Sequence, residues 1–228
     1  MIKRLYYIIL QRLYVFQKKN KPCQGKVYMF HNVNDDGDTY AISKDHFAEL
    51  LQYLVKNKKI VDIETLVAEK DKDNVVITFD DVYASVFANA YPLLKEHDVP
   101  YYLFLCNEFL DKESYLDRQM IREMIDDSKA VIGSHACHHE LSRFKDSEQI
   151  RKELEQSKAE LQELSGKEVR DFAFPYGSIY ACSKQNISDA GSLFDHVFMT
   201  YALAYNEEYG KIIPRININD KTYKAELK

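Results

Sequence analysis

Short β-rich segments alternate with longer helical patterns along most of this 228-residue chain, and this order limits the folds available to it. The helical patterns lie near residues 44–57, 84–97, 118–127, 147–165 and 180–190. The predicted strands are Lys26–Phe30, Asn74–Phe79, Pro100–Leu105, Ala130–Gly133, Val169–Phe174, His196–Thr200 and Lys211–Ile216. Such alternation predicts parallel strands joined by right-handed crossovers. Seven or so units favour an α/β fold that is a small, irregular (β/α) barrel, with residues 23–228 as a single domain.

The charge of the chain does not indicate a nucleic-acid-binding protein. The formal charge is −5 and the sequence pI is about 5.8, whereas nucleic-acid binding favours a basic surface. Residues 1–21 carry six basic residues and no acidic one, which leaves 25 basic against 36 acidic residues in the remainder. The four cysteines are widely spaced and form no CxxC pair, which in a chain of this length indicates a reducing compartment.

The basic segment at residues 1–22 is predicted to form an amphipathic helix. Its apolar residues follow the three-and-four spacing of one helical face, and they are Ile2, Leu5, Tyr6, Ile9, Leu13 and Phe16. The longest apolar run is too short to span a bilayer, and no signal-peptide cleavage site follows it. A helix lying on an anionic membrane surface fits this pattern, and a helix packed against the domain's own core is the alternative. We therefore expect a cytoplasmic protein that is not secreted, with the inner membrane face as a candidate location. The oligomeric state is left open.

Two adjacent acids end the apolar run VVITFDD. Adjacent side chains of a continuing strand point to opposite faces, so Asp80 and Asp81 share a pocket only if the strand stops there. Their mutual repulsion would raise one pKa unless a cation neutralises one of them. A solvated acidic turn is the alternative interpretation.

A second predicted strand is followed by the segment SHACHH. His135 and His139 are four residues apart, so on one helical turn they share a face, as a metal-binding pair must. His138 points elsewhere, and Cys137 is more simply a small packing residue than a ligand. A third strand breaks at Pro175-Tyr176-Gly177, which by itself is only a turn signal.

Together these three segments resemble the polysaccharide deacetylase superfamily, a carbohydrate esterase family with the NodB-homology domain. Thr78-Phe79-Asp80-Asp81 is similar to the first motif of the family and His135-x-x-x-His139 to the second. Phe174-Pro175-Tyr176-Gly177 is similar to the third. The resemblance runs from Val27 to Ile216, and the order and spacing of the motifs agree as well.

The resemblance implies a role for each matching residue. It makes Asp81, His135 and His139 the ligands of one divalent metal, most simply Zn²⁺, because two imidazoles and one carboxylate leave a coordination position open. It makes Asp80 the general base and the Tyr176 backbone N–H a donor to the oxyanion. Pro175 and Tyr176 would contact the substrate.

Several residues depart from the family pattern. Val82 replaces a common Gly, so the turn after the acids is expected to need no positive φ. Ala173 stands where an Arg that orients the base is usual, the later Trp is missing, and no Leu-x-His motif supplies an acid. We expect Arg215 to replace the missing Arg beside Asp80, with a surface Arg as the alternative. His31, which follows the first predicted strand, is the candidate acid or substrate-binding residue.

The resemblance therefore implies a metal-dependent hydrolase that removes N-acetyl groups from a glycan or a lipid-linked sugar precursor. A metal-binding or glycan-binding module without turnover is one alternative, because an Arg and a His of the family are missing. A deacetylase of an O-acetyl ester or of a non-sugar amide is another, because the same metal site serves each of these bonds.

Overall fold

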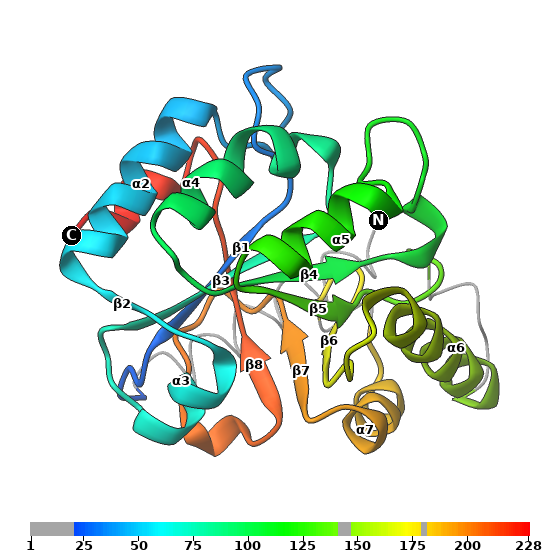
Figure 1. The fold of residues 1–228 in the computed structure, drawn as a ribbon. Helices are drawn as coiled ribbons and strands as arrows, with labels where there is room; N and C mark the ends of the chain where they lie inside the picture. The colour runs from blue at the N-terminus through cyan, green and yellow to red at the C-terminus, as the bar shows by residue number, and fades with distance from the viewer. Residues whose placement is uncertain (1–20, 141–146, 179–181) are drawn as a thin grey trace, which may run out of the picture.

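The computed structural model describes residues 21–140, 147–178 and 182–228, and in these ranges a ring of parallel strands is surrounded by helices (Figure 1). The strands are β1 (Lys26–Phe30), β2 (Lys59–Ile60), β3 (Asn74–Asp80), β4 (Tyr101–Leu105), β5 (Ala130–Ser134), β6 (Asp171–Ala173), β7 (His196–Met199), β8 (Ile212–Pro214) and β9 (Ile216–Asn217). Their spatial order is β8-β7-β6-β5-β4-β3-β1-β9, with β2 beside β3, and every pair is parallel. This arrangement confirms the predicted (β/α) barrel.

One short segment nearly closes the ring of strands. β8 pairs with β7 and β9 pairs with β1, so they stand at opposite ends of the strand order, yet only Arg215 separates them in the chain. The single strand predicted over Lys211–Ile216 was therefore wrong, because the chain changes neighbours at Arg215. The change of neighbours places Arg215 at the junction of the barrel, where its side chain is fully buried.

The helices are α2 (Lys44–Asn57), α3 (Ile63–Glu69), α4 (Tyr91–Glu96), α5 (Arg118–Asp127), α6 (Ser147–Ser165) and α7 (Lys184–Leu193). Side-chain caps begin three of them: Asp62 accepts from the Thr65 N–H, Asp117 from the Met120 N–H and Ser183 from the Asn186 N–H. The helix predicted near 84–97 is a wide π-type turn at Val86–Ala90 followed by α4. Pro92 in the first turn of α4 explains this, because a proline has no N–H to continue the preceding ladder.

The side chains of β4 alternate between two buried layers. Tyr102 and Phe104 of β4 belong to a cluster inside the barrel, whereas Tyr101, Leu103 and Leu105 belong to the larger cluster that includes helical residues. Helix α3 contributes Ile63 and Leu66 to the inner cluster, and the Ile63 N–H donates to the Tyr102 hydroxyl. Helix α3 thus covers the amino end of the barrel and leaves the carboxyl ends of the strands for the site.

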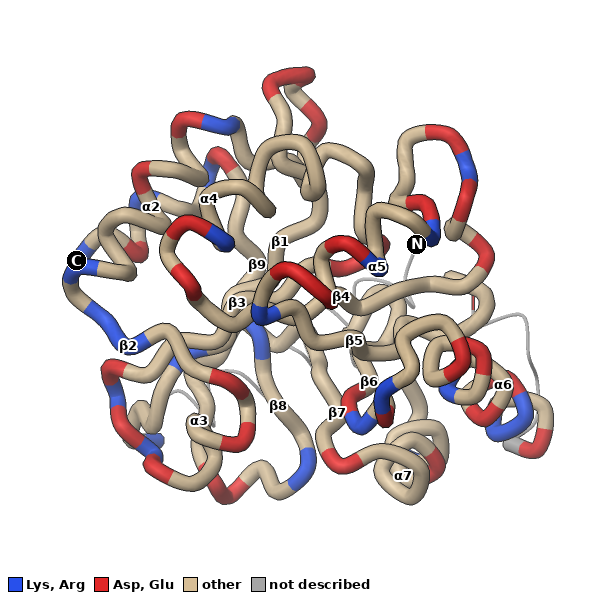
Figure 2. The backbone as a smooth tube through the Cα atoms, viewed as in Figure 1, with Lys and Arg blue, Asp and Glu red and all other residues tan. Residues whose placement is uncertain are grey.

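Charged residues gather on the outer helices and connecting loops (Figure 2). Helix α6 carries residues of both signs over its length, as expected of a solvated face (Figure 2). None of the described helices is both long and apolar enough to cross a membrane. The amphipathic helix was predicted for residues 1–22, of which residues 1–20 lie outside the described ranges. Membrane association and a cytoplasmic location therefore stay predictions.

Candidate active site

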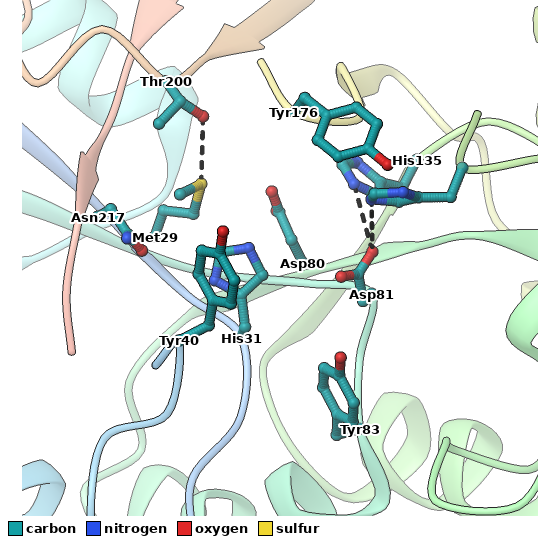
Figure 3. Close-up of a pocket in the computed structure, with 11 residues that line it drawn as sticks. Met29, His31, Tyr40, Asp80, Asp81, Tyr83, His135, Tyr176, Thr200 and Asn217 are labelled. Atoms are coloured by element: carbon teal, nitrogen blue, oxygen red, sulfur yellow. Dashed lines mark hydrogen bonds and ion pairs between the residues drawn. The ribbon is translucent and has the colours of Figure 1, made fainter. Parts of the chain in front are cut away.

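A cavity of about 260 Å³ opens at the carboxyl ends of the strands (Figure 3). Residues at or just after the ends of β1, β3, β5, β6, β7 and β9 contribute to it, as expected for a parallel barrel. Its lining consists of Met29, His31, Tyr40, Asp80, Asp81, Tyr83, His135, His139, Tyr176, Thr200 and Asn217. The cavity therefore brings together the acids, the histidine pair and the Tyr176 turn that the sequence places far apart.

Asp80 is held by a buried ion pair with Arg215. The guanidinium donates two parallel hydrogen bonds to the carboxylate, at 2.5 Å from Nη1 and 2.7 Å from Nη2. It lies between aromatic rings, 5.4 Å from the Phe104 centroid and 5.9 Å from that of Phe198. Burial acts to raise the pKa of Asp80, but the positive charge of Arg215 outweighs this effect and holds the pKa below its ordinary value. Asp80 is thus ionised inside the barrel, and the expected pairing with Arg215 is present.

A left-handed turn directs the Asp81 carboxylate into the same cavity. Strand β3 ends at Asp80, and Asp81 and Val82 have φ angles of 60° and 50°. The Val82 N–H donates to the Asp80 carbonyl at 2.6 Å, which closes the turn. The expectation that Val82 excludes a positive φ was wrong. Its side chain is buried and its carbonyl accepts from the Leu116 N–H, and these contacts hold a conformation that a β-branched residue rarely adopts.

The two histidines face Asp81 with the same ring nitrogen. Asp81 Oδ1 lies 3.5 Å from His135 Nε2 and 3.3 Å from His139 Nε2 (Figure 3). His135 Nδ1 donates to the Ala173 carbonyl at 2.7 Å, which directs Nε2 into the cavity. Burial lowers the pKa of His135 to about 3 and also lowers that of His139. Both imidazoles are therefore neutral near pH 7, the form that binds a metal.

Two carboxylates support the loop that carries the histidines. Glu108 accepts from the His139 N–H, and the buried Glu153 of α6 accepts from the His138 N–H, each at 2.6 Å. The His138 ring also contacts Glu153, at 3.0 Å, so His138 does point away from the pair. Cys137 is buried, in agreement with a packing role. The loop is thus fixed from two sides at its backbone.

Asp81, His135 and His139 fit a divalent cation. Their ligand atoms all lie within 4.8 Å of one another. Asp81 Oδ1 is buried and accepts no hydrogen bond from a described residue. Burial, followed by the neighbouring Asp80 charge, raises the pKa of Asp81 to about 6 against the opposing effect of His31. A buried carboxylate oxygen without a donor, facing two neutral imidazole nitrogens, is a candidate metal site.

The third motif forms a turn at the wall of the cavity. Tyr176 has a φ of 62°, and its ring meets the His139 ring edge-on at 4.7 Å. Gly177 follows at φ 49°, with its carbonyl accepting from the Thr200 N–H at 2.7 Å. Pro175 is buried behind this turn and is not part of the cavity lining. The turn therefore presents Tyr176, and not Pro175, to the cavity.

His31 lines the cavity as expected, and its buried Nδ1 has no hydrogen-bond partner within the described ranges. The sequence did not point to the remaining residues that line the cavity, which are Met29, Tyr40, Tyr83, Thr200 and Asn217. Met29 and Thr200 lie at or close to the ends of predicted strands, which was the available signal. Tyr40 lies in a loop, so a search for residues at strand ends does not identify it.

A parallel barrel with an Asp-His-His site and a buried, Arg-held carboxylate at its carboxyl end defines a hydrolase-type site. The family model described as polysaccharide deacetylase matches residues 68–193, more than half of the chain. The chain belongs to this family, whose members are hydrolases acting on carbon–nitrogen bonds other than peptide bonds.

Individual relatives agree with this assignment. The chain is 24% identical over 221 residues to a poly-beta-1,6-N-acetyl-D-glucosamine N-deacetylase of Staphylococcus aureus, and the match covers 89% of this chain and 76% of that protein. IcaB from Ammonifex degensii has a similar fold, with a TM-score of 0.81, 22% identity and coverage of 91% of this chain and 97% of that one. The Streptococcus pyogenes deacetylase PplD in complex with acetate has a TM-score of 0.80 and 18% identity, with coverage of 89% of this chain and 96% of that one.

Proposed function

We propose that this protein is a metal-dependent N-deacetylase of N-acetylglucosamine-containing glycans. The observation that carries this proposal is the convergence in one cavity of an Asp-His-His site and an ionised Asp80. The Staphylococcus aureus relative is named for β-1,6-linked poly-N-acetylglucosamine, so this polymer is our first choice of substrate.

Asp81, His135 and His139 would hold the metal, and we favour Zn²⁺ because this ligand set is that of catalytic zinc sites. When bound, the cation supplies a Lewis acid that polarises the acetyl carbonyl. Asp80 is ionised because Arg215 pairs with it, so it can accept the proton of the attacking water. Arg215 also fixes the direction of the carboxylate through two hydrogen bonds.

The amide bond breaks after the water oxygen has added to the acetyl carbon, and the nitrogen must gain a proton to leave. We assign this proton to His31, which lines the cavity. The Tyr176 backbone N–H is our candidate donor to the oxyanion, because the left-handed turn places Tyr176 on the cavity wall. The products are acetate and a sugar with a free amine.

The presence of Arg215 favours turnover over a binding module without activity. The missing Arg of the third motif was a reason to consider such a module. Arg215, which lies between β8 and β9, makes a bidentate contact with Asp80 in its place. A deacetylase of a non-sugar amide or an O-acetyl ester would use the same groups, so substrate choice must be tested directly.

Acetate release from β-1,6-linked N-acetylglucosamine oligosaccharides tests the proposed function. We expect Asp80→Asn to lower kcat by about 10²- to 10⁴-fold, because the amide cannot accept the water proton. Asp45→Asn is a matched control, since Asp45 is an exposed acid in the first turn of α2 and is not among the residues that line the cavity. Equal acetate release by the wild type and Asp80→Asn, or none by the wild type from any acetylated glycan, would refute the proposal.

A further inference from the structure

The cavity has a second side, where the proposed chemistry uses only His31. Asp81, His135 and Tyr176 lie on one side of Asp80, and Tyr40, Met29 and Asn217 lie on the other (Figure 3). When the acetyl group reaches the ligand side, the opposite side is available to the rest of the substrate. Two residues there have features that a structural role does not explain.

Tyr40 is an exposed aromatic residue at the cavity. Its side chain is 57% exposed, and the other exposed large hydrophobic residues within the described ranges are Val55, at 40%, and Tyr176, at 61%. Both tyrosines line the cavity, on either side of Asp80 (Figure 3). The Tyr40 N–H donates to Asp38 Oδ1 at 3.2 Å, and its ring lies 5.5 Å from the His31 ring. An aromatic face held open to solvent at a cavity is suited to the apolar C–H face of a sugar ring.

Asn217 presents a buried amide oxygen without a donor. It ends β9, where it pairs with Met29 of β1, and its Oδ1 has no hydrogen-bond partner among the residues that the structure describes. A buried polar atom without a partner costs stability, so in native proteins a ligand or water usually satisfies it. A sugar hydroxyl is a donor of the right kind.

We propose that Tyr40 and Asn217 form the sugar-recognition wall of the active site. Tyr40 packs against a face of the sugar ring, and Asn217 accepts a hydrogen bond from one of its hydroxyl groups. The ring is thereby held with its acetamido group toward Asp81 and the histidines. This proposal rests on the proposed function and adds to it the residues that recognise the sugar ring, which favours a sugar substrate over a non-sugar amide.

Binding without turnover tests the wall separately from the chemistry. All binding measurements use the full chain carrying Asp80→Asn, and calorimetry measures the Kd of a β-1,6-linked N-acetylglucosamine pentasaccharide. Adding Tyr40→Ala to this background should raise the Kd about tenfold. Tyr40→Trp should restore the Kd to within about threefold, because it keeps an aromatic face. Asn217→Ala should raise the Kd about fivefold. Val55→Ala, on α2 and outside the cavity lining, is the matched control and should leave the Kd unchanged.

Turnover by the chain with Asp80 intact gives the second readout. Tyr40→Ala should raise KM for the oligosaccharide about tenfold and lower kcat less than about threefold. The reason is that the ring contact stabilises the bound substrate and the transition state to a similar extent. An unchanged Kd and KM in both Tyr40→Ala and Asn217→Ala would refute the proposal that these residues recognise the sugar. If the wild type releases no acetate while oligosaccharide binding still depends on Tyr40, the sugar-recognition proposal is supported and only the proposed reaction is refuted.

Discussion

Asp81 is the residue at which protons and a metal compete. Its carboxylate is buried beside Asp80 and has a raised pKa of about 6, whereas the pKa of His135 is about 3. In the metal-free protein, the histidine is therefore already neutral at about pH 5, but Asp81 is mostly protonated. A cation must displace that proton to bind.

We predict that Zn²⁺ affinity rises with pH up to about 6 and then levels off. Below that pH the Kd should fall at least about tenfold for each unit by which the pH is raised, because at least the Asp81 proton leaves for each ion bound. Calorimetric titration of chelator-treated protein between about pH 5 and about pH 7.5 measures this. An affinity independent of pH in the lower part of that range would contradict the assignment of Asp81 as a ligand with a raised pKa.

Val82 shows why the turn after β3 could not be predicted from residue type. A β-branched residue at φ 50° is strained by about 1–3 kcal/mol, so sequence reasoning excludes it. Burial of the Val82 side chain and the hydrogen bond to its carbonyl offset that strain, and both depend on residues far along the chain. The adjacent acids and the histidine spacing were predictable, because their chemistry is local.

At the scale of elements, the turn after β6 depends on close contact with the end of β7. A Cβ atom on Gly177 would lie 2.5 Å from Thr200 Oγ1 and 2.8 Å from the Thr200 backbone nitrogen. Gly166, which follows α6, has a similar positive φ of 66°, but a Cβ there would meet no heavy atom within 4 Å. A comparison of alanine substitutions at the two glycines therefore separates the cost of backbone strain from the cost of steric crowding.

We predict that Gly177→Ala destabilises the protein by at least about 2 kcal/mol more than Gly166→Ala, which should itself cost about 1 kcal/mol. Gly177→Ala should also reduce acetate release, because Tyr176 is displaced from the cavity. Urea unfolding of the two variants gives the comparison. Equal losses of stability would show that Thr200 yields to the added methyl group.

Short elements account for most of the differences between predicted and observed structure. Helix α3 has only seven residues, too few for a clear apolar period, although Asp62 is a recognisable N-cap. Strand β2 has two residues and is defined by its neighbour β3. In contrast, α2, α5 and α6 have the predicted bounds, since their apolar positions repeat over several turns.

At the scale of the whole molecule, Arg215 joins barrel closure to the active site. It is the residue between β8 and β9, and its backbone N–H donates to the Met199 carbonyl at the end of β7. Its side chain pairs with Asp80 of β3. The place of Arg215 near a strand end made it a candidate from the sequence. That Arg215 separates two strands was not predicted, although Pro214, which cannot donate a ladder hydrogen bond, stands directly before it.

We predict that Arg215→Met destabilises the barrel by about 3–5 kcal/mol, because it leaves the buried Asp80 charge without a partner. The double variant Asp80→Asn, Arg215→Met should be more stable than Arg215→Met alone, since it removes both charges. Urea unfolding of the wild type, both single variants and the double variant measures the coupling. Additive losses would mean that the two side chains do not depend on each other.

The metal dependence of acetate release tests the central claim most directly. Protein treated with a chelator should release no acetate from the β-1,6-linked oligosaccharide, and one equivalent of Zn²⁺ should restore the rate in the wild type but not in Asp81→Asn. Full acetate release after complete removal of metal, or recovery of Asp81→Asn with one equivalent, would contradict the account.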